Sequence, residues 1–271
     1  MRLREPSTTD AYLIGNEASL FSISELGLHV WPIPATIGLG LLIVVPSGYV
    51  FALLSEQVGT TDSAWLLTAN HVVMLLIAVA LMACFNRGLN RGLGRGNFSE
   101  YGLEWPKQKN YVRSALLWGA AFGVIMLVAD YFPEILRHAP PPDQIPMTPR
   151  NIGSWLFFEW IFVGPTEEIP FRGLLQTFLM QRTSGRVRFW RYEMHVAGII
   201  LALLFALSHL TSFWTQKFWM ALAQQIYAFA LGVLYAYWRE KSGSVLAPII
   251  GHNVSDGVEQ VLKFLMTWAW R

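Results

Sequence analysis

The chain has 271 residues, of which 54% are hydrophobic and 14% are charged, and its formal net charge is +2. Soluble domains usually carry about 25% charged residues, so the composition excludes an ordinary soluble domain and indicates one transmembrane domain over residues 1–271. The single cysteine, Cys84, excludes both an intrachain disulfide framework and a zinc site built from cysteines.

Apolar stretches long enough to cross a bilayer, about 17–25 residues, recur along the chain. They are Trp31–Leu54, Ala64–Phe85, Ser114–Tyr131, Gly153–Met180, Met194–Leu210, Phe218–Trp238 and Ser244–Trp268. Gly251 and Gly257 interrupt the last stretch, which could therefore form two shorter helices. The stretches are continuous rather than alternating, which disfavours a β-barrel. The sequence thus predicts an all-α, polytopic membrane protein with seven or eight transmembrane helices.

Helix-breaking residues lie inside two of these stretches. Pro46 and Gly48 interrupt the first, and Gly164-Pro165 interrupts the fourth. A broken helix is tolerated in lipid where the freed backbone is buried in protein or lines a wet cavity. Gly164-Pro165 would start a new helix, with the proline in its first turn; the alternative is an ordinary kink.

Basic residues gather in alternate loops. They are Arg87, Arg91, Arg95, Lys107, Lys109 and Arg113 after the second span, Arg182, Arg186, Arg188 and Arg191 after the fourth, and Arg239 and Lys241 after the sixth. An excess of Lys and Arg marks the cytoplasmic side, so Arg2 and Arg4 also fall inside. The proline-rich segment Pro133–Arg150 then lies outside as an extended cap or lid, and Phe98–Pro106 forms a short interfacial helix.

The same distribution suggests partners and location. The Gly- and Arg-rich stretch Arg87–Gly96 adjoins a span, so contact with anionic membrane lipid is favoured over nucleic acid. The first 30 residues lack the pattern of a cleavable signal peptide. We expect an integral, multi-pass protein of a prokaryotic plasma membrane; the oligomeric state is not readable from the sequence.

The segment 167–172, Glu-Glu-Ile-Pro-Phe-Arg, places three ionisable residues in an apolar stretch. Each costs roughly 2.5–3.5 kcal/mol at membrane depth on insertion scales, so such residues usually serve a function. Glu168 and Arg172 are four residues apart and can pair on one helical face, while Glu167 points about a quarter turn away. Glu167 would then be free to act as a general base. The alternative is a structural ion cluster.

Two histidines occur in later apolar stretches. His209 follows Phe205 by four residues and His252 precedes Asp256 by four, so each pair shares a helical face. Asp256 could hold the His252 imidazole in one tautomer, or, with Ser255, cap a helix. A lone histidine at the end of a span is more often structural, and His209 becomes a candidate because a carboxylate and a second histidine accompany it.

Together these residues can carry out hydrolysis. A glutamate and a histidine can polarise a water molecule for attack on an amide carbonyl, and a second histidine can donate to the oxyanion. One glutamate and two histidines are also a zinc-like ligand set, but the sequence H-E-x-x-H is absent, so a site without cofactor is favoured over zinc. Glu159 could line the same cavity, and His71 and Asn70 are predicted to be contacts between helices.

These strings resemble the CAAX protease and bacteriocin-processing family of glutamate-dependent intramembrane peptidases, which includes Rce1-like proteins. The family pattern is Glu-Glu-x-x-x-Arg, then Phe-x-x-x-His, then His-x-x-x-Asn or Asp, and all three occur here in order. The resemblance covers residues 98–265, a peptidase-like core. It implies about eight spans around a polar intramembrane cavity, with Glu167 and His209 activating water, His252 and Asp256 stabilising the oxyanion, and Glu168 and Arg172 in support.

The resemblance leaves several points open. Asp256 stands where an asparagine can donate a hydrogen bond, and an ionised carboxylate only accepts. Asp256 is therefore protonated, or orients His252, or leaves oxyanion stabilisation to His252 alone. The expected partner is a protein or peptide, with or without a lipid modification, cut near its C-terminus or next to the membrane. Alternatives are a transporter or channel that uses the buried charges, against which stands the lack of an inverted repeat, and a non-catalytic immunity factor or scaffold of the same fold.

Overall fold

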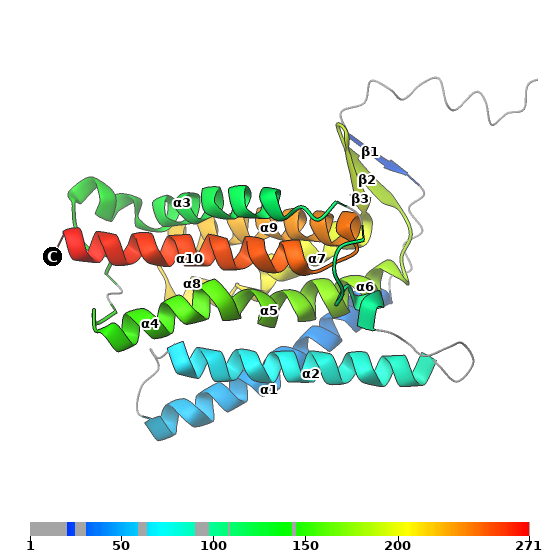
Figure 1. Ribbon diagram of the computed structural model, residues 1–271, viewed down its shortest axis with the longest axis horizontal. Helices are drawn as coiled ribbons and strands as arrows, with labels where there is room; N and C mark the ends of the chain where they lie inside the picture. The colour runs from blue at the N-terminus through cyan, green and yellow to red at the C-terminus, as the bar shows by residue number, and fades with distance from the viewer. Residues whose placement is uncertain are drawn as a thin grey trace, which may run out of the picture.

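The structure is a computed structural model that describes residues 21–24, 31–58, 64–89, 98–107, 109–142 and 145–270. It is a bundle of helices with a small sheet at one end (Figure 1). The long helices are α1 (Pro32–Val58), α2 (Ala64–Leu89), α3 (Val112–Arg137), α7 (Val196–Ser208), α9 (Phe218–Ser242) and α10 (Leu246–Ala269). The short ones are the 3₁₀ helix η2 (Phe98–Tyr101) and α8 (Ser212–Thr215).

Five helices are long and apolar enough to cross a membrane, and they correspond to α1, α2, α3, α7 with α8, and α9. The predicted count of seven or eight is therefore not confirmed. The fourth predicted stretch is divided into short segments. The last one, α10, carries three charged residues, Asp256, Glu259 and Lys263, along its middle part. The fourth stretch and α10, which are not among these five helices, both contain candidate site residues.

The fourth stretch is one rod of five segments. It consists of α4 (Pro149–Phe157), the π-helix η3 (Phe158–Phe162), α5 (Val163–Glu168), the π-helix η4 (Ile169–Leu175) and α6 (Gln176–Met180). The predicted helix start at Gly164-Pro165 is not observed, because Phe162 and Val163 both have helical backbone angles and the rod continues from η3 into α5. Short π segments inside helices are frequent at functional sites, and here they flank the Glu167-Glu168 pair on both sides.

A close contact between α5 and α10 explains the glycine at position 164. The Gly164 N–H donates to Asn253 Oδ1 at 2.7 Å, and a Cβ atom at this position would lie 2.5 Å from that oxygen and 2.6 Å from the Ile249 carbonyl oxygen. The suggestion that Gly251 and Gly257 divide the last stretch is wrong, because α10 is one continuous helix. Both glycines instead admit aromatic side chains of neighbouring helices against its backbone.

The prediction of an all-α fold needs one correction. The strands β1 (Phe21–Ser24), β2 (Arg186–Phe189) and β3 (Tyr192–His195) form an antiparallel sheet in that order. Residues 186–189 alternate arginine with apolar side chains, a period-two pattern typical of a half-buried strand. From the sequence, we expected these arginines in a basic loop after the fourth span.

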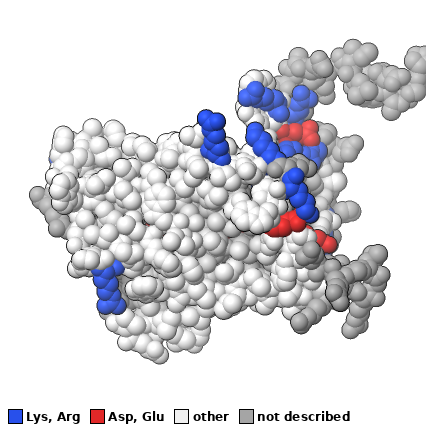
Figure 2. Space-filling model, viewed as in Figure 1, with Lys and Arg blue, Asp and Glu red and all other residues white. Residues whose placement is uncertain are grey.

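Charged side chains concentrate at the end of the molecule that carries the sheet (Figure 2). We call it the basic end; its described cations are Lys107, Lys109, Arg113, Arg182, Arg186, Arg188, Arg191, Arg239 and Lys241. Helices α2, α6 and α9 end there and α3 begins there (Figure 1). Arg91, Arg95 and the first 20 residues, with Arg2 and Arg4, lie outside the described residues.

The two predicted surface segments are smaller than expected. Within Pro133–Arg150, α3 continues to Arg137 through Pro133 and α4 begins at Pro149, so an extended lid is confined to the residues between them. The predicted helix over Phe98–Pro106 is the single 3₁₀ turn η2.

Candidate active site

Glu168 is fully enclosed by charged partners. Its Oε2 lies 3.1 Å from Arg172 Nε, and neither side chain is exposed to solvent, so the predicted pairing is confirmed. Its Oε1 accepts from His252 Nδ1 at 2.8 Å. The Arg172 guanidinium also lies 4.8 Å from the centre of the Phe205 ring, a favourable cation–π contact. Glu168 therefore ties α5 and η4 to α10.

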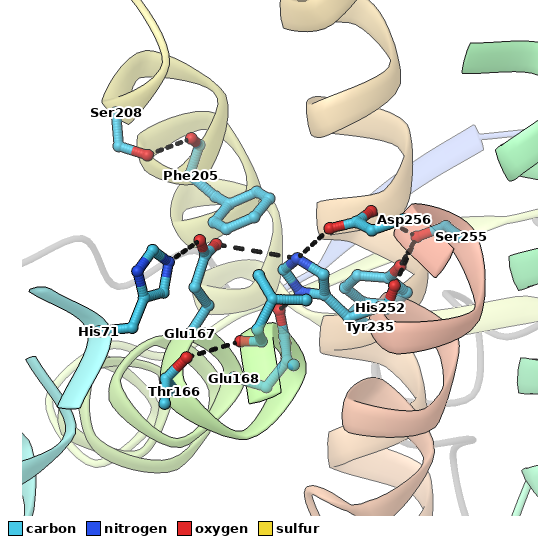
Figure 3. Close-up of polar contacts among 12 residues, drawn as sticks. His71, Thr166, Glu167, Glu168, Phe205, Ser208, Tyr235, His252, Ser255 and Asp256 are labelled. Carbon is cyan, nitrogen blue, oxygen red and sulfur yellow. Dashed lines mark hydrogen bonds and ion pairs between the residues drawn. The ribbon is translucent and has the colours of Figure 1, made fainter. Parts of the chain in front are cut away.

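Glu167 points to a different set of groups, and its side chain is 18% exposed. Its Oε1 lies 3.1 Å from His71 Nε2 on α2, and its Oε2 lies 3.8 Å from His252 Nε2 on α10 (Figure 3). Three elements thus meet at this carboxylate. Sequence reasoning had treated His71 as a contact between helices; it is one, but its partner is the candidate base.

The hydrogen bonds of His71 define where one proton resides. Its Nδ1 lies 2.8 Å from the Leu67 carbonyl oxygen, which only accepts, so Nδ1 carries hydrogen. Nε2 then faces a carboxylate oxygen, which accepts unless it is protonated. His71 and Glu167 therefore share one further proton, carried on Nε2 or on Oε1.

His252 lies between carboxylates on both of its ring nitrogens. Nδ1 faces Glu168, and Nε2 lies 3.2 Å from Asp256 Oδ2, so the predicted alignment of His252 with Asp256 is confirmed. Both nitrogens face acceptors, which favours the imidazolium form. The ring stacks on Tyr235 with centroids 5.7 Å apart. The alternative of a helix cap at Ser255 or Asp256 is wrong, because α10 begins at Leu246.

His209 is the C-cap residue of α7. Its Nδ1 donates to the Phe205 carbonyl oxygen at 2.9 Å, which in a neutral ring leaves the Nε2 lone pair as a base. The Phe205 ring separates the two histidines, with its centroid 5.1 Å from His209 and 6.2 Å from His252. The structure brings Glu167, Glu168, Arg172, His252 and Asp256 into one network, and places His209 on the wall of the same cavity as His252.

Residues 149–258 match a family described as Type II CAAX prenyl endopeptidase Rce1-like. We refer to residues 149–258 as the Rce1-like region. The family is one of proteases, and together with the apolar helices it shows that the chain is an integral, multi-pass membrane protein. No curated protein and no solved structure matches the chain.

The Rce1-like region is narrower than the predicted core of residues 98–265. It contains Glu167, His209, His252 and Asp256, and it begins at α4 and ends within α10. His71 lies on α2, outside it. One contact of the candidate base Glu167 therefore comes from a part of the chain that carries no family pattern, and sequence reasoning missed it for that reason. The only signal in the sequence was a histidine in the middle of an apolar helix.

A cavity of about 290 Å³ adjoins the Rce1-like site. His209, His252 and Asp256 share its wall with Asp130, Glu159, Tyr227, Glu259, Gln260 and Lys263. This lining is mainly polar and charged. Within the described residues, no group of three or more His, Cys, Asp or Glu side chains is arranged to hold a metal ion.

Proposed function

We propose that this protein is an intramembrane endopeptidase that hydrolyses a peptide bond of a protein or peptide with an activated water molecule. The observation that carries the proposal is the convergence of Glu167 and His252 at 3.8 Å from separate helices. They meet beside a cavity that His209 also lines, and Glu167 remains partly exposed. The match of residues 149–258 to a family of proteases also supports the proposal.

In this mechanism Glu167 and His209 accept the proton of the attacking water. The water oxygen forms a bond to the carbonyl carbon, and its proton passes to the Glu167 carboxylate or to His209 Nε2. When the C–N bond breaks, that proton moves to the leaving nitrogen. General base catalysis of this kind contributes typically 10²–10⁴-fold. No covalent intermediate forms on the protein.

His252 supplies positive charge near the oxygen of the substrate carbonyl that the water attacks. Its Nε2–H donates to the oxyanion, which is the contact that stabilises a tetrahedral intermediate. Asp256 accepts from the same nitrogen at 3.2 Å, so we assign it to orienting His252 rather than to donating to the oxyanion. Glu168 fixes the opposite ring nitrogen, and Arg172 neutralises Glu168.

His71 is a positioning residue in this proposal. Its Nε2 holds Glu167 Oε1, which leaves Oε2 facing His252 and available to a water molecule. The shared proton keeps the pair from carrying an uncompensated negative charge in an apolar bundle. Holding a reacting group in place matters because a displacement of about 1 Å can cost about 100-fold in rate.

The proposal is tested by incubating the purified protein in detergent with a peptide library and identifying the products by mass spectrometry. Wild-type protein should yield new termini, and Glu167→Gln should yield none above background. Glu193→Gln, a change in strand β3, is the matched control and should cleave normally. Cleavage that survives Glu167→Gln contradicts the proposal. Loss of cleavage with a zinc chelator, restored by zinc, contradicts the metal-free mechanism.

The role of His71 has its own test on a substrate found this way. His71→Phe removes the nitrogen that holds Glu167, and we expect kcat to fall by about 100-fold with little change in KM. His71→Gln places an amide donor near the same position and should recover part of the loss. If both variants keep wild-type kcat, His71 is only a contact between helices.

A further inference from the structure

The cavity at the site extends toward one end of the bundle. Beyond His252 it is lined by Asp130 in the second half of α3, Trp155 in the last turn of α4, Gln216 just before α9, and Lys263 late in α10. Helices α3 and α10 end, and α4 and α9 begin, at the end opposite the sheet (Figure 1). Along α10, His252 and Lys263 are eleven positions apart, or about 16 Å.

On the other side, between the site and the basic end, side chains of several helices form a buried layer. Arg172 and Gln176 are completely buried, and Tyr235 and Trp238 are each 1% exposed. Gln176 Nε2 donates to the Ala236 carbonyl oxygen at 3.0 Å, which joins α6 to α9 across this layer. A substrate therefore reaches His252 from the end opposite the sheet.

The charge distribution assigns these two ends to sides of the membrane. Lys and Arg accumulate in cytoplasmic loops, and the basic end carries the clusters that follow α2, α6 and α9. At the opposite end the described cations are Arg137, Arg150, Lys217 and Lys263, and Lys217 is paired with Glu134 at 3.0 Å. The basic end is then cytoplasmic, and the mouth of the cavity is extracytoplasmic.

Two amide side chains in the cavity indicate what it receives. Gln260 is 7% exposed, and its Nε2 has no hydrogen-bond partner in the described part of the chain. Gln224 Oε1 is also buried without a partner among those residues. Both residues line the cavity. Buried polar groups are normally satisfied, and an extended peptide backbone supplies both the carbonyl and the N–H that these amides lack.

We propose that the site takes its substrate from the extracytoplasmic face, and that this substrate is a polar peptide segment exposed on that face rather than a lipid-modified cytosolic tail. The cleavage itself rests on the proposed function, whereas the side of entry rests only on the position of the cavity and on the loop charges. The two can therefore be tested separately.

The side of entry is tested by labelling single cysteines. On a Cys84→Ala background, Gln216→Cys places a thiol at the cavity mouth and Arg188→Cys places one in the sheet; both positions are exposed. In intact cells, a membrane-impermeant maleimide should label the first and should label the second only after permeabilisation. The reverse pattern, or labelling of both in intact cells, overturns the inference whether or not the protein is a peptidase.

The side of cleavage is tested in sealed proteoliposomes. A polar peptide library is either added outside or enclosed, maleimide labelling of Gln216→Cys reports which way the protein faces, and Glu167→Gln vesicles give the background. Products should appear only when the peptides share a compartment with the cavity mouth. Cleavage confined to the compartment of the basic end overturns the inference. An absence of cleavage in detergent as well would contradict the proposed function, while the labelling result would stand.

Discussion

The site separates two halves of the bundle that differ in how tightly they are closed. Toward the basic end, Glu168, Arg172 and Tyr235 are buried and bound to one another or stacked on His252. Toward the opposite end lies a cavity lined mainly by polar and charged side chains, such as Gln260. We refer to these as the closed half and the open half.

The difference is concentrated in two adjacent residues. Glu168 belongs to the closed half and has no exposed surface, whereas Glu167 keeps 18% of its side chain exposed. The closed half fixes the geometry of the site and the open half admits a reactant. Substitutions in the closed half should therefore reduce stability, and those in the open half should affect substrate binding or turnover.

The largest effect on stability is expected from Arg172→Met. Removing one partner of a buried ion pair leaves the other charge uncompensated and costs about 3–5 kcal/mol. We expect this loss in the free energy of unfolding, measured by thermal or denaturant unfolding in detergent. The double variant with Glu168→Gln should recover part of it, and Arg188→Met, at an exposed position, is the control. Equal stability of the single and double variants would show that the pair is not coupled.

A smaller loss is expected where α5 meets α10. Gly164→Ala places a methyl group 2.5 Å from Asn253 Oδ1 and 2.6 Å from a backbone oxygen, and overpacking of this kind costs about 1–3 kcal/mol. Gly153→Ala is a matched control in α4, because no atom lies within 4 Å of its added methyl group. Unfolding measurements on both should separate them; equal stabilities would contradict the close contact.

Where the sheet joins α7, a helix cap makes a pH-dependent contribution of at most about 1 kcal/mol to the free energy of unfolding. His195 caps α7 by accepting the Ala197 N–H at its Nδ1. Burial lowers the pKa of His195 below its ordinary value, with Arg186 adding to the effect and Glu240 opposing it. Because the folded-state pKa is lowered, this stability is present above about pH 6.5 and is lost as the pH falls below it.

His195→Asn tests this contribution, because asparagine caps helices well and does not titrate. Unfolding temperatures of the two proteins should be similar at pH 7.5, and the wild-type value should fall more on acidification toward pH 5. Parallel curves for both proteins would contradict a role for His195.

The smallest effect on stability is expected in the open half. Gln260→Met removes a buried donor without a partner among the described residues and replaces it with an apolar group of similar size, a change that is nearly neutral or stabilising. We expect a change within about 0.5 kcal/mol, together with a higher KM for a cleaved peptide. A large loss of stability would show that this amide is part of the closed half.

Spacing along one helix was enough to predict some features. The pairs Glu168 with Arg172 and His252 with Asp256 depend only on residues close in sequence. The contact of His71 with Glu167 was not predictable, because it depends on how α2 packs against α5. The sheet was missed because its arginines masked the alternation, and the single helix α10 because Gly251 suggested a break that neighbouring aromatic rings instead fill.

The most direct test of the division between the two halves compares Glu167→Gln with Glu168→Gln in the same preparation. Cleavage rate and unfolding temperature are measured for each, with wild-type protein as the reference. The account predicts that Glu167→Gln keeps the unfolding temperature and loses cleavage by about 10²–10⁴-fold, whereas Glu168→Gln lowers the unfolding temperature. Cleavage retained by Glu167→Gln, or lost in a Glu168→Gln protein of unchanged stability, would contradict it.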